Sequence, residues 1–221
     1  MVTVLEGEEK FKMILILSIL LFLYTGICAI SYAKTTSSEI ASSVFRLHVI
    51  ANSDSAEDQS LKYKVRDNLL NYMNTICSNA TSKEEAILIA KNHLNDFQKI
   101  AEQTISNNNY NYPVKVEIGN FEFPTKTYGD ISLPAGIYDA LRVKIGKAEG
   151  KNWWCVMFPP LCFIDVTSGV VPDESKELLK ENMNKEDFAL ISDNNSHSNI
   201  TFKFKILELF AENNFSTAKS K

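Results

Sequence analysis

The chain has 221 residues, of which 45% are hydrophobic and 23% charged, and its formal net charge is -4. This composition is typical of a globular domain with a real core, and it excludes a disordered chain or a disulfide-dense miniprotein. The lysines and arginines are scattered along the sequence, so there is no basic patch of the kind that binds nucleic acid.

The N-terminal part differs in composition from the rest of the chain. Lys10 and Lys12 precede an uncharged run rich in Ile and Leu from Met13 to Ile30, and the small-x-small pattern Ser31-Tyr32-Ala33 follows. This order is typical of an export signal, and we expect cleavage after Ala33. Because the apolar run is nearly long enough to span a bilayer, an uncleaved membrane anchor is the alternative.

The export signal sets the predicted domain organisation. We predict a signal peptide over residues 1–33, a polar linker over residues 34–43 and an extracytoplasmic domain over residues 44–221. Three glutamates precede the lysines, which leaves open whether translation begins at Met1 or at Met13. Either start places the domain outside the cell, with membrane contact only through the N-terminal segment.

Export changes the interpretation of the cysteines. If Cys28 leaves with the signal, the mature chain keeps Cys77, Cys155 and Cys162, an odd number in a compartment that permits disulfides. A disulfide between Cys155 and Cys162 is the simplest arrangement, and buried free thiols are the alternative. With three histidines and no Cys-x-x-Cys spacing, we expect no metal site and no cofactor.

The domain begins with a predicted strand from Val44 to Ala51, in which apolar and polar residues alternate. A helix follows, with Ser55 and Asp58 spaced as a capping box. Its apolar face consists of Leu61, Val65, Leu69, Met73 and Ile76. His48, Asp54 and Asp58 lie near the strand end, where open sheets bind ligands, but helix capping already accounts for the acids.

A second long helix is predicted from Thr81 to about Ser106, again with capping residues at its start. From Pro113 the period changes to two, which predicts a strand from Val114 to Ile118, with its continuation through Phe121 and Phe123 left open. A second strand is predicted over Ile137 to Ile145, with a loop over Thr127 to Leu133 between them. Gly146 to Gly150 then predicts a hairpin turn into the next strand.

Both tryptophans lie in the strand predicted from Trp153 to Phe158. Pro159 and Pro160 then form a rigid bend, because neither can donate to a sheet ladder, and a second apolar segment runs from Leu161 to Ile164. The aromatic residues of this bend either fill the core or form a partly exposed docking surface. Cys155 and Cys162 are expected to face each other across it.

The last part of the chain is predicted as a short helix from Pro172 to Met183, a loop from Asn184 to Asn199, and a strand or short helix from Ile200 to Phe210. The helical periods precede the alternating ones, which favours a single α+β domain. In it, two long N-terminal helices pack on a mostly antiparallel sheet, preceded by the hydrophobic export signal.

Three stretches resemble the stage II sporulation protein R family. They are FRLHVIANSDSAEDQSLKYKVRD from Phe45, LPAGIYDALRVKIG from Leu133 and NWWCVMFPPLCF from Asn152. The resemblance implies an exported signalling protein of endospore-forming bacteria. Such a protein is made in the forespore, enters the space between the forespore and mother-cell membranes, and activates a membrane-embedded aspartic protease that cleaves pro-sigma-E.

This resemblance implies a protein partner and no chemistry by the chain itself, hence no small-molecule substrate. The candidate docking residues are Trp153, Trp154, Phe158, Pro159 and Pro160, with Arg46, His48 and Asp54 as polar candidates. Two alternatives stay open: an exported hydrolase that uses Cys155 and His48, and a structural component of the spore envelope.

Overall fold

The computed structural model describes residues 2–162 and 171–192. The chain divides between Thr36 and Ser37 into two units, which are considered separately. The predicted segment from Ile200 to Phe210 lies outside the described residues, as do the last two residues of the segment predicted from Leu161 to Ile164.

Helix α1 (Val2–Ser42) contains the predicted export signal. Over Glu9–Ser42 it is long and apolar enough to cross a membrane, and within the described residues it alone meets that criterion. This is consistent with a signal peptide or an anchor. The polar segment predicted as a linker is helical as far as Ser42, because its last apolar residues, Ile40 and Ala41, gain burial against the second unit to which they belong.

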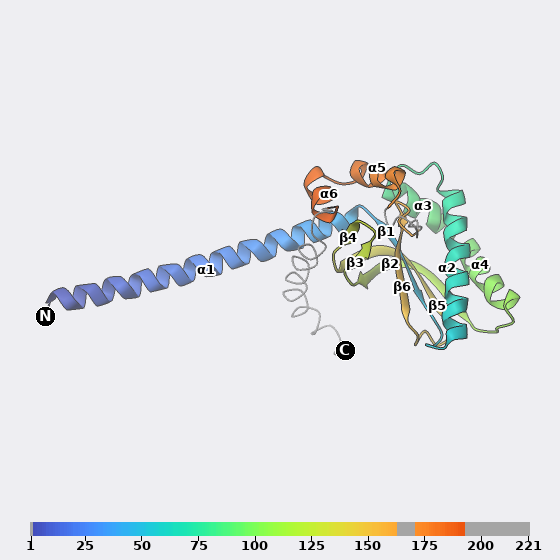
Figure 1. Ribbon diagram of the computed structural model, residues 1–221, viewed down its shortest axis with the longest axis horizontal. Helices are drawn as coiled ribbons and strands as arrows, with labels where there is room; N and C mark the ends of the chain where they lie inside the picture. The colour runs from blue at the N-terminus through green and yellow to red at the C-terminus, as the bar shows by residue number, and fades with distance from the viewer. Residues whose placement is uncertain (1, 163–170, 193–221) are drawn as a thin grey trace. The chain divides into compact units, whose positions relative to one another are not determined.

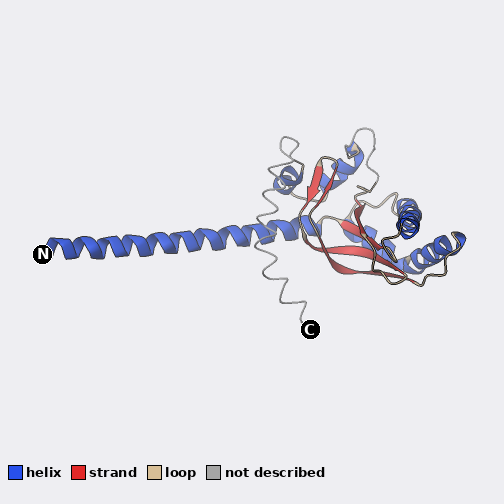
Figure 2. Cartoon of the chain, turned by 60° about the horizontal axis from the view of Figure 1, so that its bottom comes forward, coloured by secondary structure: helices blue, strands red, loops and turns tan. Residues whose placement is uncertain are grey.

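A four-stranded sheet with the order β2-β5-β1-β6 organises the second unit (Figures 1 and 2). Its strands are β1 (Phe45–Ile50), β2 (Val114–Phe123), β5 (Gly136–Ile145) and β6 (Asn152–Phe158). Strand β1 pairs in parallel with β5 and antiparallel with β6, while β2 pairs antiparallel with β5. The predicted α+β class and the mostly antiparallel sheet are confirmed.

The predicted hairpin between β5 and β6 is wrong, because β1 lies between these strands. Their connection instead crosses the end of β1. The N–H groups of Lys147 and Gly150 donate to Asn52 Oδ1 at 3.0 Å and to the Ala51 carbonyl at 3.0 Å, respectively. The turn therefore binds the residues that follow β1 and carries the chain past it.

Helices α2 (Ala56–Ile76) and α4 (Leu94–Asn107) lie side by side and contact the sheet, α2 at β1 and α4 at β2 (Figure 1). Ser55 caps α2 as predicted, since its hydroxyl accepts the N–H of Asp58 at 3.1 Å. The Asp58 carboxylate, however, accepts from Asn52 and Ser53 and so does not close the predicted capping box.

The second predicted helix is two helices, α3 (Lys83–Asn92) and α4, which are separated at His93. His93 has φ -104° and ψ 16°, outside the helical range, and it ends α3 and precedes α4. Its ring nitrogen Nδ1 lies 2.8 Å from the Tyr72 hydroxyl and 2.9 Å from Asp96 Oδ2. These polar contacts with α2 and α4 favour the break over a continuous helix.

Two predicted loops contain regular structure. Strands β3 (Lys126–Tyr128) and β4 (Ile131–Leu133) form a hairpin where a connecting loop is predicted. Helix α5 (Asp173–Glu181) is followed by α6 (Lys185–Ile191), which begins where a polar loop is predicted because the Asn184 side chain caps it and Ile191 is buried.

The two outermost strands of the sheet have different surroundings. The side chain of Gln98 in α4 lies along the outer edge of β2, where its amide donates to the Val114 carbonyl at 2.8 Å and accepts the Val116 N–H at 2.9 Å. Gln98 thus takes the place of a neighbouring strand at β2. Strand β6 is the other edge of the sheet, and the residues of functional interest lie along it.

Candidate binding groove along strand β6

Trp153 and Trp154 point to opposite faces of the sheet, because side chains alternate along a strand. Trp153 faces α2, where its ring centroid lies 5.4 Å from that of Tyr63 and 4.2 Å from the Arg66 guanidinium carbon. Trp154 faces the other side and stacks on His48 at a centroid distance of 3.6 Å. Both indoles are half-buried, so the sequence-predicted pair reaches solvent on either side of β6.

A groove of about 710 Å³ runs along this edge, with α2 on one side and β3 on the other. Lys62, Tyr63 and Arg66 contribute from α2, and β3 contributes all three of its residues, Lys126 to Tyr128. Residues 151–155 form its wall along β6, and Leu161 and Cys162 close one part of it. The groove therefore joins segments that are far apart in the sequence.

The groove is positively charged, although the chain as a whole is negative. Four cations line it, Lys62, Arg66, Lys126 and Lys151, against a single acid, Asp67. Asp67 lies 2.7 Å from Arg66, and within the described part of the chain this is the one ion pair among these groups. Burial and the nearby Arg66 lower the pKa of Lys62, whose ammonium donates to Gln59 and to the Lys151 carbonyl.

The backbone of β6 presents polar groups to this groove. The carbonyl of Trp154 accepts from the Tyr128 hydroxyl at 3.2 Å and that of Val156 accepts from the Leu161 N–H at 3.2 Å, so both point away from β1. In an antiparallel pair, alternate residues turn both their N–H and their C=O outward. The N–H groups of Asn152 and Trp154 and the carbonyl of Asn152 therefore face the groove.

A disulfide joins β6 to the segment after the bend. The sulfur atoms of Cys155 and Cys162 are 2.27 Å apart, with their Cα atoms 5.4 Å apart. The structure thus brings together the two cysteines of the predicted bridge. Cys77 is a free cysteine, and burial raises the pKa of its thiol to about 11. With its sulfur in the bridge, Cys155 has no thiol to serve as the nucleophile of a Cys155 and His48 pair.

Arg46 is fully buried among aromatic rings, on the face of the sheet opposite helices α2 and α4. Its guanidinium carbon lies 4.1 Å from the Phe123 centroid and 4.5 Å from that of Tyr138, and its Nη2 donates to the Tyr128 hydroxyl at 2.6 Å. Tyr128 in turn donates to the carbonyl of Trp154. Arg46 therefore acts on the groove indirectly, by fixing Tyr128 against the edge of β6.

His48 is buried beside Trp154, and its Nε2 lies 2.8 Å from Asn152 Oδ1. Burial lowers the pKa of His48 to about 4, and the positive charges of Arg142, Lys144 and Arg46 act in the same direction. His48 is therefore neutral at pH 7. It supports Trp154 by stacking and holds Asn152 at the start of β6.

The remaining sequence-predicted residues support the groove without forming it. Phe158 and Pro159 are buried, and Pro160 is partly exposed; its carbonyl accepts from Ser175 at 2.9 Å. Asp54 lies at the far end, where its carboxylate accepts the N–H of Lys151 at 2.6 Å. In this structure the bend holds the end of β6, and Asp54 holds its beginning.

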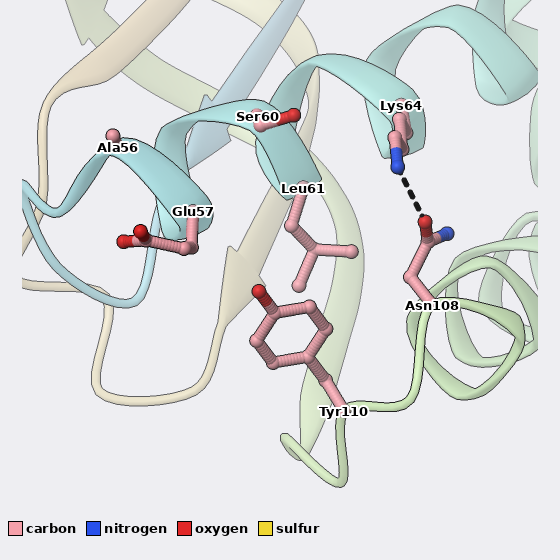
Figure 3. A pocket seen from close by; sticks show the side chains of 7 residues that line it. All are labelled: Ala56, Glu57, Ser60, Leu61, Lys64, Asn108 and Tyr110. Carbon is pink, nitrogen blue, oxygen red and sulfur yellow. Dashed lines mark hydrogen bonds between the residues drawn. The ribbon is translucent and has the colours of Figure 1, made fainter.

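A second, smaller hollow of about 340 Å³ lies between α2 and the loop after α4 (Figure 3). It contains none of the predicted site residues. Lys64 on α2 donates to the Asn108 side chain at 2.6 Å, and the Tyr110 ring lies beside Leu61 (Figure 3). These contacts join two helices, which accounts for the hollow as a packing feature.

Sequence reasoning identified the tryptophans and missed the cations of the groove. Lys62, Arg66 and Lys126 lie in segments with ordinary helix or strand patterns, and only the folded chain brings them to β6. The one local signal was the Lys/Arg content of the first predicted helix. Within the described residues, no group of three or more His, Cys, Asp or Glu side chains is placed to hold a metal ion.

Together, the mostly antiparallel sheet and its helices define an α+β protein with a long apolar N-terminal helix. The family described as Stage II sporulation protein R (spore_II_R) matches residues 41–168 of the chain. Stage II sporulation protein R of Bacillus subtilis (strain 168) is 35% identical over 184 residues, which is 79% of this chain and 82% of that protein. The chain belongs to the stage II sporulation protein R family. No solved structure matches it.

Proposed function

We propose that this protein is an exported signal of endospore formation that activates the membrane-embedded aspartic protease which cleaves pro-sigma-E in the mother cell. It acts from the space between the forespore and mother-cell membranes, and it performs no chemistry itself. The family places the protein in sporulation. The apolar helix α1 is consistent with its export.

The observation that carries this proposal is the groove along β6. It combines two half-buried tryptophans, outward backbone groups and four cations, features that suit a protein surface. Nothing in its described lining resembles a nucleophile with a base in reach, because the cysteine beside the tryptophans is in a disulfide. Binding, therefore, is the activity that this geometry favours.

Activation by binding requires a difference in affinity. The protease exists in inactive and active arrangements, and a ligand shifts this equilibrium only if it binds the active arrangement more tightly. The domain would therefore bind a surface that the extracytoplasmic part of the protease presents in its active arrangement. Trp153 and Trp154 are the expected anchors, because aromatic side chains concentrate binding energy at interfaces.

The test reconstitutes the signal in a host that does not sporulate. The full chain is exported together with the protease and pro-sigma-E, and processing is followed by immunoblotting. We expect processing only when the chain is present and exported, and a large loss for Trp154→Ala at unchanged protein level. Processing without the chain would refute the proposed function; normal processing by both Trp153→Ala and Trp154→Ala would refute the anchors.

A structural role in the spore envelope is the competing function, and gene deletion separates the two. A signalling protein is needed for pro-sigma-E cleavage, so its deletion leaves the precursor uncleaved. A structural component is needed only for assembly. Normal cleavage in a deletion strain with a defective envelope would therefore favour the structural role.

A further inference from the structure

We infer that the outer edge of β6 binds an extended, acidic segment of the protein partner, which adds to the sheet as a further strand next to β6. This inference rests on the proposed function, because it describes how the same groove would bind the protease. The expected ligand is a peptide whose backbone forms hydrogen bonds with β6. A folded helix or a lipid surface would not use the unpaired strand.

The backbone of β6 provides the donors and acceptors for such pairing. The outward N–H groups of Asn152 and Trp154, with the carbonyl of Asn152 between them, repeat at the two-residue spacing of an incoming strand. In residues 2–162 and 171–192, no hydrogen bond to either of these two N–H groups is found. An added strand would satisfy them, as in other cases of strand addition to a sheet edge.

At the opposite edge of the sheet, a helix side chain occupies part of the outward backbone of β2. At β2, Gln98 occupies both an outward carbonyl and an outward N–H. At β6 the Trp154 and Val156 carbonyls are also occupied, but the outward groups of Asn152 and the N–H of Trp154 face the groove. Exposed strand edges carry a risk of aggregation. Unpaired backbone groups that are kept in a groove therefore favour a role in binding another strand.

The charge of the groove selects the kind of segment. Lys126 and Lys151 have no carboxylate at ion-pair distance among the described residues. Arg66 is paired with Asp67, and the buried ammonium of Lys62 donates to Gln59 and to the Lys151 carbonyl. An extended segment in the groove would pass between Lys151, next to the start of β6, and Lys126 on β3, with Arg66 on the α2 wall. Glutamate or aspartate at alternate positions would therefore find a cation on either side, whereas a basic segment would be repelled.

The decisive variant removes a backbone donor. Asn152→Pro eliminates the outward N–H and leaves the pairing of β6 with β1 intact, because that N–H does not point toward β1. Asn152→Ala is the matched variant: it loses the same side chain and its contact with His48, yet keeps the N–H. The comparison between the two isolates the backbone group.

The two variants are compared in the reconstituted export assay with the full chain. We expect Asn152→Pro to need about tenfold more exported chain than Asn152→Ala for half-maximal processing, since a lost hydrogen bond and a blocked strand weaken binding by about that factor. Limited proteolysis of the exported protein checks that both variants are folded. Equal processing by two folded variants would overturn the inference while leaving the proposed function in place.

A charge variant provides a second test that does not depend on proline. Lys126→Glu reverses one cation on the β3 side of the groove, and Lys99→Glu makes the same change on α4, which packs at the opposite edge of the sheet. We expect Lys126→Glu alone to reduce processing, and acidic-to-basic changes in the bound segment to restore it. Equal effects from both lysines would mean that only overall charge matters, which contradicts a defined groove.

A photo-crosslinking residue at position 126 tests binding in the groove even if the wild-type chain causes no pro-sigma-E processing in the reconstituted host. In sporulating cells, we expect it to label an acidic segment of one protein, and Asn152→Pro to abolish that label relative to Asn152→Ala. Failure of processing together with this label would refute the proposed function and support the groove. The same labelling from position 99, or labelling unaffected by Asn152→Pro, would overturn the groove.

Discussion

Strands β2 and β6 form the two edges of one four-stranded sheet, and their outward backbone groups have different neighbours. At β2, the Gln98 amide binds the Val114 carbonyl and the Val116 N–H. At β6, one outward carbonyl meets the Tyr128 hydroxyl, and the groups around Asn152 face a groove. At β2 a helix side chain occupies two outward groups, whereas at β6 the groups around Asn152 remain in contact with the groove.

Strand β6 has supporting contacts on both of its faces. Tyr128 and Arg46 fix one side of β6, while Lys62 and Trp153 keep α2 beside the other. The groove is thus a built feature with walls on both sides. Changes in these supports should alter β6 and leave β2 largely unaffected.

The largest effect is expected from Arg46→Ala, which removes a fully buried side chain among Phe123, Tyr138 and Tyr128. The cavity should lower the free energy of unfolding by about 3 to 5 kcal/mol. Arg46→Met fills most of the volume, so it should cost less while still releasing Tyr128. Chemical denaturation measures the free energy of unfolding of both variants. If Arg46→Met is as unstable as Arg46→Ala, the charged group contributes more to stability than the packed volume does.

Loss of the disulfide should have the next largest effect. Cys155→Ser frees the segment after the bend, and the short loop that the bridge closes predicts a loss of roughly 2 to 3 kcal/mol in unfolding free energy. Alkylation of the unreduced, denatured exported protein followed by mass spectrometry tests the bridge directly. Cys77 should be labelled, and Cys155 and Cys162 should not; labelling of all three would identify core thiols.

His48 predicts a dependence of stability on pH. Its pKa is lowered to about 4 in the folded protein, against 6.5 when unfolded, so the unfolded chain binds the proton more tightly. The contribution of neutral His48 is complete above pH 6.5 and is lost as the pH falls toward 4. Between pH 7 and pH 5 this should cost about 2 kcal/mol.

The matched variant for this effect is His48→Gln, which keeps a polar contact for Asn152 but does not titrate. Thermal unfolding of both proteins at several pH values measures the difference. The wild type should lose stability more steeply than His48→Gln between pH 6.5 and 4. Parallel curves would indicate that His48 is more hydrated than the structure shows.

The smallest effect sharpens the comparison at the other edge. Gln98→Ala leaves the Val114 carbonyl and the Val116 N–H without their partner, which should cost about 1 to 2 kcal/mol of stability. The opened edge should also cause concentration-dependent association, measurable by light scattering. Gln103→Ala, at an exposed position of the same helix, is the control and should do neither.

Local patterns predicted much of the fold. The cap at Ser55, the apolar period of α2 and the alternation in β1 and β5 all depend on neighbours within a few residues, and each of these elements is present. The order of the strands depends on distant pairings instead. Nothing near Gly146 to Gly150 indicates that this turn will bind the end of β1, about 95 residues earlier in the chain.

The candidate site also contains residues that local patterns predict and residues that only the fold brings together. Trp153 and Trp154 stand out in the sequence, and their opposite orientations follow from strand alternation. The sequence leaves Phe158 and Pro159 open between a core position and a docking surface, and the fold buries both. Lys62 and Lys126 look like ordinary surface lysines, because only the packing of α2 and β3 against β6 makes them neighbours.

The disulfide between Cys155 and Cys162 also ties the shape of the groove to the compartment. Leu161 and Cys162 close part of the groove, and the bridge fixes them to β6. Disulfides form outside the cytoplasm and are kept reduced within it. For the exported signal that we propose, the chain would therefore lack this covalent tie before export, and crossing the membrane would both deliver the signal and complete the groove.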